Sequence, residues 1–425
     1  MAEYTLTPKV DQAQEFIEIA NDFANPLDLV REAISNAFDA TANEIRMSFE
    51  TDVQGGETVF VIRITDNGSG MDKSGLQSFF DLGNSTRRGD ADAIGEKGHG
   101  TKVYFNSKKL VVDTQRDGTR RIATLDSPFA RLHSREIPSV TVTEEKSETL
   151  ETGTTISIYA YNNNRRERFT HDRIRDHIYW FTKFGSVERQ FEKDTFSDVK
   201  LQLMGLDRDS FETLEFGHPF PEESADADAL FNTHSIQAPK FYSRRITKTG
   251  HLPRHPEIRY SSIFSIEGSK VKYDSNPMLR RSGWVAPEGA YTIQERYGLW
   301  LCKDFIPVQR KNEWITTKGS EFTKLHAFFN CQSLKLTANR GSVENTPAEI
   351  LQDIEDVVRK IYEEIIESKD WLALSYLEAE VESYNTIEKE KKNFDIRVEK
   401  ANKAKIAKYK DIVLVEPQRE SGVQS

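Results

Sequence analysis

Three polar side chains near the start of the chain recur at helical spacing. Glu32, Asn36 and Asp39 stand at positions i, i+4 and i+7, so a helix would present all three on one face. The Asn36 amide oxygen suits Mg²⁺, which prefers hard oxygen ligands, and Glu32 could orient and deprotonate an attacking water. Taken alone, the pattern is more often the solvated face of an amphipathic helix.

A second polar group, DNGSGM at 66–71, follows an apolar run that has the composition of a strand. A carboxylate at a strand end, here Asp66, can accept a hydrogen bond from an adenine amino group. Gly68 and Gly70 would let the backbone lie against the base without a Cβ in the way. A plain strand-to-helix turn is an equally good interpretation of this motif by itself.

A glycine-rich segment, IGEKGHGTK at 94–102, supplies the third group. Glycines ahead of a helix start can direct free backbone N–H groups at phosphate oxygens, and the lysines of the segment add positive charge. The Gly-Lys-Ser/Thr order of a Walker A loop is absent. A glycine-rich loop alone is weak evidence, so its order and distance from the other two motifs are what matter.

Together these motifs resemble those of the GHKL, or Bergerat-fold, ATPase superfamily. Residues 32–40 fit ExxxNxxDA, residues 66–71 fit DxGxGM, and residues 95–100 fit GxxGxG. The sequence GTT at 153–155 resembles the fourth element of that family, whose threonine supports the adenine-binding aspartate through water. The resemblance spans about residues 10–160.

The resemblance implies that ATP and Mg²⁺ bind to this part of the chain. It makes Glu32 the catalytic residue and Asn36 the metal ligand. It also implies an ATP site made of Asn36, Asp39, Asp66, Gly68, Gly70, Met71, Gly95, Lys97, Gly98, His99, Gly100, Thr101, Lys102 and Thr154. His99 is interpreted as a residue of the lid rather than as a metal ligand or a base.

Two branches of the superfamily resemble this chain most. FDLGNSTRR at 80–88 and Lys102 are similar to the MORC branch, in which a lysine at that place contacts phosphate. The domain order is similar both to MORC proteins and to the ninety-kilodalton heat-shock chaperones, whose transducer domain reaches into the ATP site. LKLTANRGS at 334–342 resembles a chaperone segment whose arginine touches the γ-phosphate, so Arg340 is the candidate sensor. An ordinary loop arginine explains Arg340 equally well, and weaker rivals are Lys303, Arg310 and Lys311.

The elements that must position these motifs follow from periodicity and turn residues. The sequence predicts helices over 11–23 and 26–41, strands over 44–50 and 57–65, a helix capped by Asp72, a lid over 82–100, a helix start near Gly100, and strands over 109–114, 119–125, 138–144 and 153–161. Asn25 is a plausible N-cap of the second helix. This order predicts an α/β (α+β) Bergerat-type two-layer sandwich, with helices on one face of a mainly antiparallel sheet.

The rest of the chain is divided by composition. We expect an ATP-binding domain over 1–165, a middle α/β transducer over 166–345, and a helical tail over 346–425 with a disordered end. A charge-dense stretch at 164–175 supports the first boundary, and a helical stretch is expected around 317–330. Within the middle domain, 240–259 is locally basic.

Composition limits the function classes. A net charge of -10 argues against a protein coated with basic surface for nucleic acid, although a local basic patch remains compatible with it. Cys302 and Cys331 are not spaced as a metal knuckle, and so few cysteines suit the reducing cytoplasm. The chain has no run of about 18 apolar residues, so we expect no membrane span.

These observations predict a slow Mg²⁺-dependent ATPase that uses ATP as a conformational switch. Its N-terminal domains are expected to pair as a homodimer when ATP binds. Two biological roles remain open: a chaperone-like remodeller of protein clients, and a DNA-associated clamp of MORC type that serves defence against foreign DNA.

Overall fold

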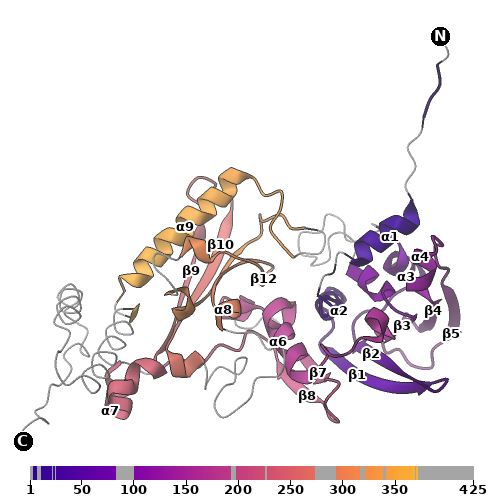
Figure 1. Ribbon diagram of the computed structural model, residues 1–425, viewed down its shortest axis with the longest axis horizontal. Coiled ribbons are helices and arrows are strands. Elements are labelled where there is room, and N and C mark those ends of the chain that lie inside the picture. Colours follow the sequence, from indigo (N-terminus) through magenta and orange to yellow (C-terminus); the bar gives the residue numbers. More distant parts are fainter. Residues whose placement is uncertain are drawn as a thin grey trace, which may run out of the picture. The chain divides into compact units, whose positions relative to one another are not determined.

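The computed structural model (Figure 1) describes residues 3–6, 11–21, 23, 25–82, 100–192, 198–224, 227–272, 293–315, 321–337, 341–368 and 370–371. The chain divides into two compact units. The first consists of Met1–His218 with Leu336–Ser342, and the second of Pro219–Lys335 with Val343–Ser425.

The first unit is built on one large sheet. Its strands are β1 (Glu44–Gln54), β2 (Glu57–Asp66), β3 (Lys109–Arg116), β4 (Thr119–Asp126), β5 (Thr141–Lys146), β6 (Gly153–Tyr159), β7 (Lys200–Met204) and β8 (Glu212–Glu215). They lie in the order β5-β4-β3-β6-β2-β1-β7-β8. Among the described strands of this sheet, β1 and β7 form a parallel pair and all other neighbours are antiparallel. The predicted mainly antiparallel sheet is therefore confirmed.

The helices of this unit match the predicted order. They are α1 (Gln12–Asn21), α2 (Asp28–Asp39), α3 (Lys73–Phe80), α4 (Pro128–His133), α5 (Tyr161–Asn164) and α6 (His171–Phe181), with 3₁₀ helices η1 (Gly100–Phe105), η2 (Lys183–Gly185) and η3 (Val187–Gln190). Asp72 caps α3 as predicted, because its Oδ1 accepts the Gly75 N–H at 2.7 Å. Asn25 lies two residues ahead of the N-cap of α2, and its Oδ1 accepts the Leu27 N–H at 3.1 Å.

Rows of apolar side chains cross one face of the sheet in register. Two such rows run over β1, β2, β6, β3 and β4: Met47, Ile64, Ile156, Val112 and Ala123, and then Phe49, Ile62, Ile158, Leu110 and Leu125. All of these side chains are at most 5% exposed. Helix α2 buries its own apolar stripe, from Leu29 to Phe38, and supplies the second layer. The fold class predicted from the sequence is confirmed.

The predicted boundary after residue 165 differs from the division that the structure shows. Residues 166–218 belong to the first unit. β7 extends the sheet as the parallel partner of β1, with Leu201 opposite Ile45. The Phe169 ring packs against Phe49 at 5.6 Å and Phe60 at 4.9 Å between centroids. The charge-dense stretch at 164–175 therefore leads into α6 and is not a linker between domains.

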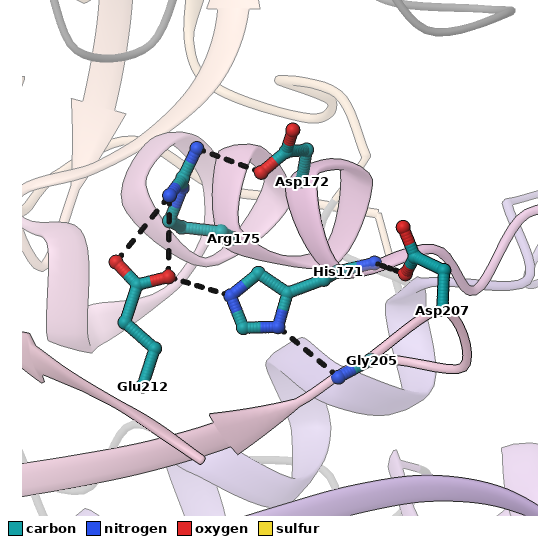
Figure 2. Close-up of polar contacts among 6 residues, drawn as sticks. All are labelled: His171, Asp172, Arg175, Gly205, Asp207 and Glu212. Carbon is teal, nitrogen blue, oxygen red and sulfur yellow. Dashed lines mark hydrogen bonds and ion pairs between the residues drawn. The ribbon is translucent and has the colours of Figure 1, made fainter. Parts of the chain in front are cut away.

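A polar network around the buried His171 ties α6 to the β7–β8 segment (Figure 2). His171 Nδ1 accepts the Gly205 N–H at 3.2 Å, so Nε2 carries the proton and donates to Glu212 Oε2 at 2.6 Å. Arg175 lies 3.2 Å from the same Glu212 oxygen and 2.9 Å from Asp172. Burial raises the pKa of Glu212, but the His171 hydrogen bond and the Arg175 charge outweigh it and lower that pKa. The network explains why this segment folds with the first unit.

The second unit contains a mixed sheet. Its strands are β9 (Ser243–His251), β10 (Arg259–Glu267), β11 (Gly298–Lys303), β12 (Ile306–Arg310) and β13 (Leu325–Cys331), in the order β12-β11-β13-β10-β9. Its helices are α7 (Ala227–His234), α8 (Ile293–Arg296) and α9 (Ala348–Ile366), with 3₁₀ helices η4 (Ser235–Phe241), η6 (Asn312–Trp314) and η7 (Glu321–Lys324).

Two predictions for this unit need comment. The helical stretch expected around 317–330 is wrong, because 325–331 is strand β13, and each of its residues is buried. A short apolar run that is covered on both faces has no period that separates a strand from a helix. Helix α9 lies near the predicted start of the tail at residue 346, but it belongs to the second compact unit, and residues 372–425 lie outside the described part of the chain. No helix in the described part is long and apolar enough to cross a membrane.

Candidate nucleotide-binding site

A polar row continues the apolar rows at one end of the sheet. Asp66 on β2 lies opposite Thr154 on β6, Thr154 lies opposite Thr114 on β3, and Thr114 lies opposite Arg121 on β4. These residues share a face with Ile64 because strand residues two apart point the same way. The polar groups therefore lie on the face that the helices cover, where they can meet the polar edge of a bound molecule.

The Asp66 carboxylate lies in a protected environment. Burial raises its pKa from 3.8 to about 6, although hydrogen bonds from the Gly68 and Thr154 backbone act in the opposite direction. Its Oδ1 accepts the Gly68 N–H at 2.9 Å. A desolvated carboxylate of this kind is typical of functional sites, and its role toward adenine stays a prediction.

The glycines of the second motif have packing roles that the sequence did not reveal. A Cβ on Gly68 would lie 2.7 Å from the Ala40 Cβ at the end of α2. Gly70 has φ +63, and a Cβ there would lie 2.0 Å from the Gln115 carbonyl oxygen. Both positions thus require glycine for close approach to other parts of the protein, in addition to any approach to a base.

Thr114 joins the second and fourth motifs, and sequence reasoning missed it. Its Oγ1 accepts the Met71 N–H at 2.8 Å and lies 3.0 Å from Thr154 Oγ1 and 3.2 Å from the Gly153 carbonyl oxygen. The residue is 1% exposed. The signal was available in the alternation of β3, where Leu110, Val112 and Thr114 share one face, but it could be used only once the pairing with β6 was known.

The first and third motifs meet at Glu32. A Cβ on Gly100 would lie 1.9 Å from Glu32 Oε2 and 2.8 Å from Glu32 Cδ, so the last glycine of the phosphate loop lies directly against this carboxylate. The neighbouring Arg31 is 8% exposed. Its Nε lies 3.4 Å from Glu32 Oε1, and its Nη1 lies 3.3 Å from Asp28 Oδ1. Burial raises the pKa of Asp28, Arg31 opposes the rise, and Glu32 adds to it. Arg31 and Asp28 support the site but carry no motif signal.

Lys102 is fully buried at the end of α3. Its Nζ donates to the Phe79 carbonyl oxygen and to Thr101 Oγ1, both at 2.8 Å, and Thr101 Oγ1 donates to the same carbonyl at 2.7 Å. Burial lowers the pKa of Lys102 to about 7, although Asp81 opposes the shift. Here the lysine satisfies a helix C-terminus, and its contact with phosphate stays a prediction.

Several predicted residues are not placed within the site. Gly95, Lys97, Gly98, His99 and Arg340 lie outside the described residues. Asp39 is the last residue of α2 and is half-buried. The rival sensors belong to the second unit, where Lys303 and Arg310 end β11 and β12 and Lys311 lies 3.2 Å from Glu313.

The basic cluster at 240–259 is largely neutralised within the second unit. Its ion pairs join Lys248 to Glu364 at 3.1 Å, Arg254 to Asp356 at 2.8 Å, Arg245 to Glu223 at 3.5 Å and Arg244 to Asp370 at 3.8 Å. Such surface pairs contribute little stability. They do place acidic groups beside the basic ones, which weakens the case for a phosphate-binding surface there.

The two-layer fold and the order of the polar motifs agree with an ATP-binding domain of the GHKL type, and the comparison with known families supports this for one segment of the chain. Residues 26–157 match the family described as histidine kinase-, DNA gyrase B-, and HSP90-like ATPase. The matched segment contains the Glu32 helix, the Asp66 turn, the glycine-rich loop and Thr154. A comparison with curated proteins finds no match.

Proposed function

We propose that this protein is a Mg²⁺-dependent ATPase that uses ATP to switch conformation. The observation that carries the proposal is the contact between Gly100 and the Glu32 carboxylate. It places the last glycine of the GxxGxG motif against a candidate general base on α2. A protein that only bound nucleotide would not need a carboxylate at that place.

One described residue, Asn36, offers a ligand suited to a magnesium ion, and the described residues hold no cluster of acidic or histidine ligands beside it. Asn36 would hold it through its amide oxygen, a hard ligand of the kind this ion prefers. The Asn36 Nδ2 atom is buried and makes no hydrogen bond of good geometry, so no such bond fixes the orientation of the amide. When bound with ATP, the ion neutralises charge on the phosphates.

The protein side chains bind the nucleotide and activate the attacking water. Asp66 accepts a hydrogen bond from the adenine amino group, and the Thr114–Thr154 pair holds the turn beside it. Glu32 takes a proton from the water that attacks the γ-phosphorus, while the 82–100 lid covers the nucleotide. Arg340 completes the site by contacting the γ-phosphate, as its resemblance to the chaperone segment suggests.

The catalytic assignment is tested with purified Glu32→Ala. It should bind ATP with nearly the affinity of the parent protein but release phosphate at least about 10²-fold more slowly, since general-base catalysis contributes that much. Glu32→Ala that hydrolyses ATP at the parent rate would refute the assignment. Arg340→Ala should likewise lower turnover with little effect on adenine recognition.

We further propose that ATP pairs the N-terminal domains of two copies and that the switch acts on a protein client. The acidic partners in the ion pairs of the 240–259 cluster weaken its attraction for DNA phosphates, so they favour a protein rather than DNA as the molecule on which the switch acts. Light scattering with and without a non-hydrolysable ATP analogue should show a doubling of mass with the analogue. Salt-sensitive DNA binding that depends on 240–259 would favour a MORC-type clamp instead.

A further inference from the structure

Two buried polar atoms in the ATP-binding domain lack hydrogen-bond partners. They are Asn36 Nδ2 on α2 and the Tyr104 hydroxyl on η1. Among the described residues of the matched segment 26–157, no other buried side-chain nitrogen or oxygen is in this condition. Unsatisfied buried groups cost stability and are rare, so two in one site require an explanation.

Tyr104 reaches this site from the element that follows the phosphate loop. The residue is 0% exposed, and its ring stacks on Phe79 with centroids 6.0 Å apart. Burial and the Glu32 carboxylate raise the pKa of Tyr104, and Asp66 adds to the rise, so the hydroxyl stays protonated. The Asn36 side chain lowers that pKa as a hydrogen-bonding neighbour, so the Asn36 amide lies close to this hydroxyl although no hydrogen bond of good geometry joins them. The hydroxyl therefore lies beside the Asn36 amide and within the electrostatic influence of the Glu32 and Asp66 carboxylates.

An amide has two distinct ends, and fixing one of them orients the other. The Asn36 nitrogen can only donate, and its oxygen can only accept or ligate a cation. The Tyr104 hydroxyl oxygen can accept from that nitrogen. Once it does, the Asn36 oxygen is directed away from Tyr104 and is free for a metal.

We propose that Tyr104 is a positioning residue for the metal ligand: its hydroxyl accepts a hydrogen bond from Asn36 Nδ2 in the nucleotide complex and so holds Asn36 Oδ1 toward the magnesium ion. This inference rests on the proposed function. It also explains why this position carries a tyrosine, since the ring of a phenylalanine would fill the space beside Phe79 equally well.

The test is Tyr104→Phe, which keeps the ring and removes the hydroxyl. The readout is the affinity for a fluorescent ATP analogue with and without Mg²⁺, together with Mn²⁺ binding to the nucleotide complex followed by electron paramagnetic resonance. Tyr104→Phe should weaken the metal-dependent part of nucleotide affinity about tenfold, as expected for one hydrogen bond to a buried amide. Affinity without metal should change less than about twofold.

A double-mutant cycle separates positioning from packing. In an Asn36→Ala background, Tyr104→Phe should have no further effect on the metal-dependent affinity, because the group that it orients is gone. Tyr161→Phe is the control for the loss of a buried tyrosine hydroxyl near the site: Tyr161 is 2% exposed, the Asp28 carboxylate raises the pKa of its hydroxyl, and that hydroxyl in turn raises the pKa of Tyr104 without contacting the Asn36 amide in any recorded hydrogen bond. It should leave metal dependence unchanged.

Two results would overturn the inference. One is a Tyr104→Phe protein with the metal dependence of the parent. The other is an equal loss of affinity with and without metal, which would mean that the hydroxyl contacts nucleotide or only stabilises the fold. Failure of the proposed function is visible separately, because the parent protein itself would then show no metal-dependent nucleotide binding.

Discussion

Substituting Gly100 by alanine probes the contact that joins the phosphate loop to the candidate base. The new Cβ would lie 1.9 Å from Glu32 Oε2, whereas real Cβ atoms essentially never approach a neighbour within 3.0 Å. The difference shows that the carboxylate must move by about 1.1 Å or more. The fold can accommodate this because the clash is with the end of a flexible side chain rather than with backbone.

We expect Gly100→Ala to lower the turnover number rather than the stability of the protein. A misplacement of about 1 Å at a reacting group lowers rates about 10²-fold, so Gly100→Ala should reduce kcat by roughly that factor. The melting temperature should change by only a few degrees, because no apolar contact is lost. Steady-state phosphate release gives kcat, and thermal unfolding of the same preparations reports stability.

Gly75→Ala is the matched control for a glycine substitution in the same unit. A Cβ there would meet Asp72 Oδ1 at 3.4 Å, an ordinary contact, and its N–H would still reach the cap. It should keep parent kcat. If Glu32→Ala abolishes hydrolysis while Gly100→Ala hydrolyses at the parent rate, the inferred displacement of the carboxylate is refuted. If neither variant is slowed, Glu32 is not the base.

Three further predictions concern buried polar groups. Asp66→Asn should weaken ATP binding yet raise the free energy of unfolding at pH 7 by about 3 kcal/mol. Burial raises the pKa of Asp66 from 3.8 to about 6, so the parent loses stability as pH rises through that range. Denaturant titrations at pH 4 and pH 7 should therefore show a change in the free energy of unfolding that differs between the parent and Asp66→Asn by about 3 kcal/mol. Burial lowers the pKa of Lys102 from 10.5 to about 7, so between these pH values the unfolded chain holds a proton that the folded protein has lost. The stability of the parent should therefore rise over this range, and Lys102→Met should abolish the rise. A variant whose melting temperature has the same pH profile as the parent would contradict this. Thr114→Val should lower the free energy of unfolding in urea by about 1–3 kcal/mol, because the part-buried Met71 N–H loses its acceptor. Thr65→Val, on the opposite face of the sheet, should lower it by less than about 1 kcal/mol. Equal losses would argue against the role of Thr114.

Local signals in the sequence account for the elements around the site. Helical spacing placed Glu32 and Asn36 on one helix, and the structure has them on α2. The Asp72 cap and the strand end at Asp66 follow from turn chemistry that acts over a few residues. These features were predictable because the groups involved are neighbours in the sequence.

Contacts between distant parts of the chain were not predictable in the same way. Thr114 accepts from Met71, 43 residues earlier, and meets Thr154, 40 residues later. The extension of the first unit to His218 depends on β7 pairing with β1 across more than a hundred residues. Periodicity within a segment carries no information about which strand it will pair with.

The sequence by itself predicted the class of site: an ATP-binding domain with a candidate base, a candidate amide ligand and a candidate adenine acceptor in a fixed order. Tertiary structure decided how those groups are held. It placed Gly100 against Glu32, buried Lys102 at the end of α3 and brought the Tyr104 hydroxyl to Asn36. The reason is physical, since motif residues are specified by their own chemistry, whereas their supports are specified by sheet register and packing that only the folded chain establishes.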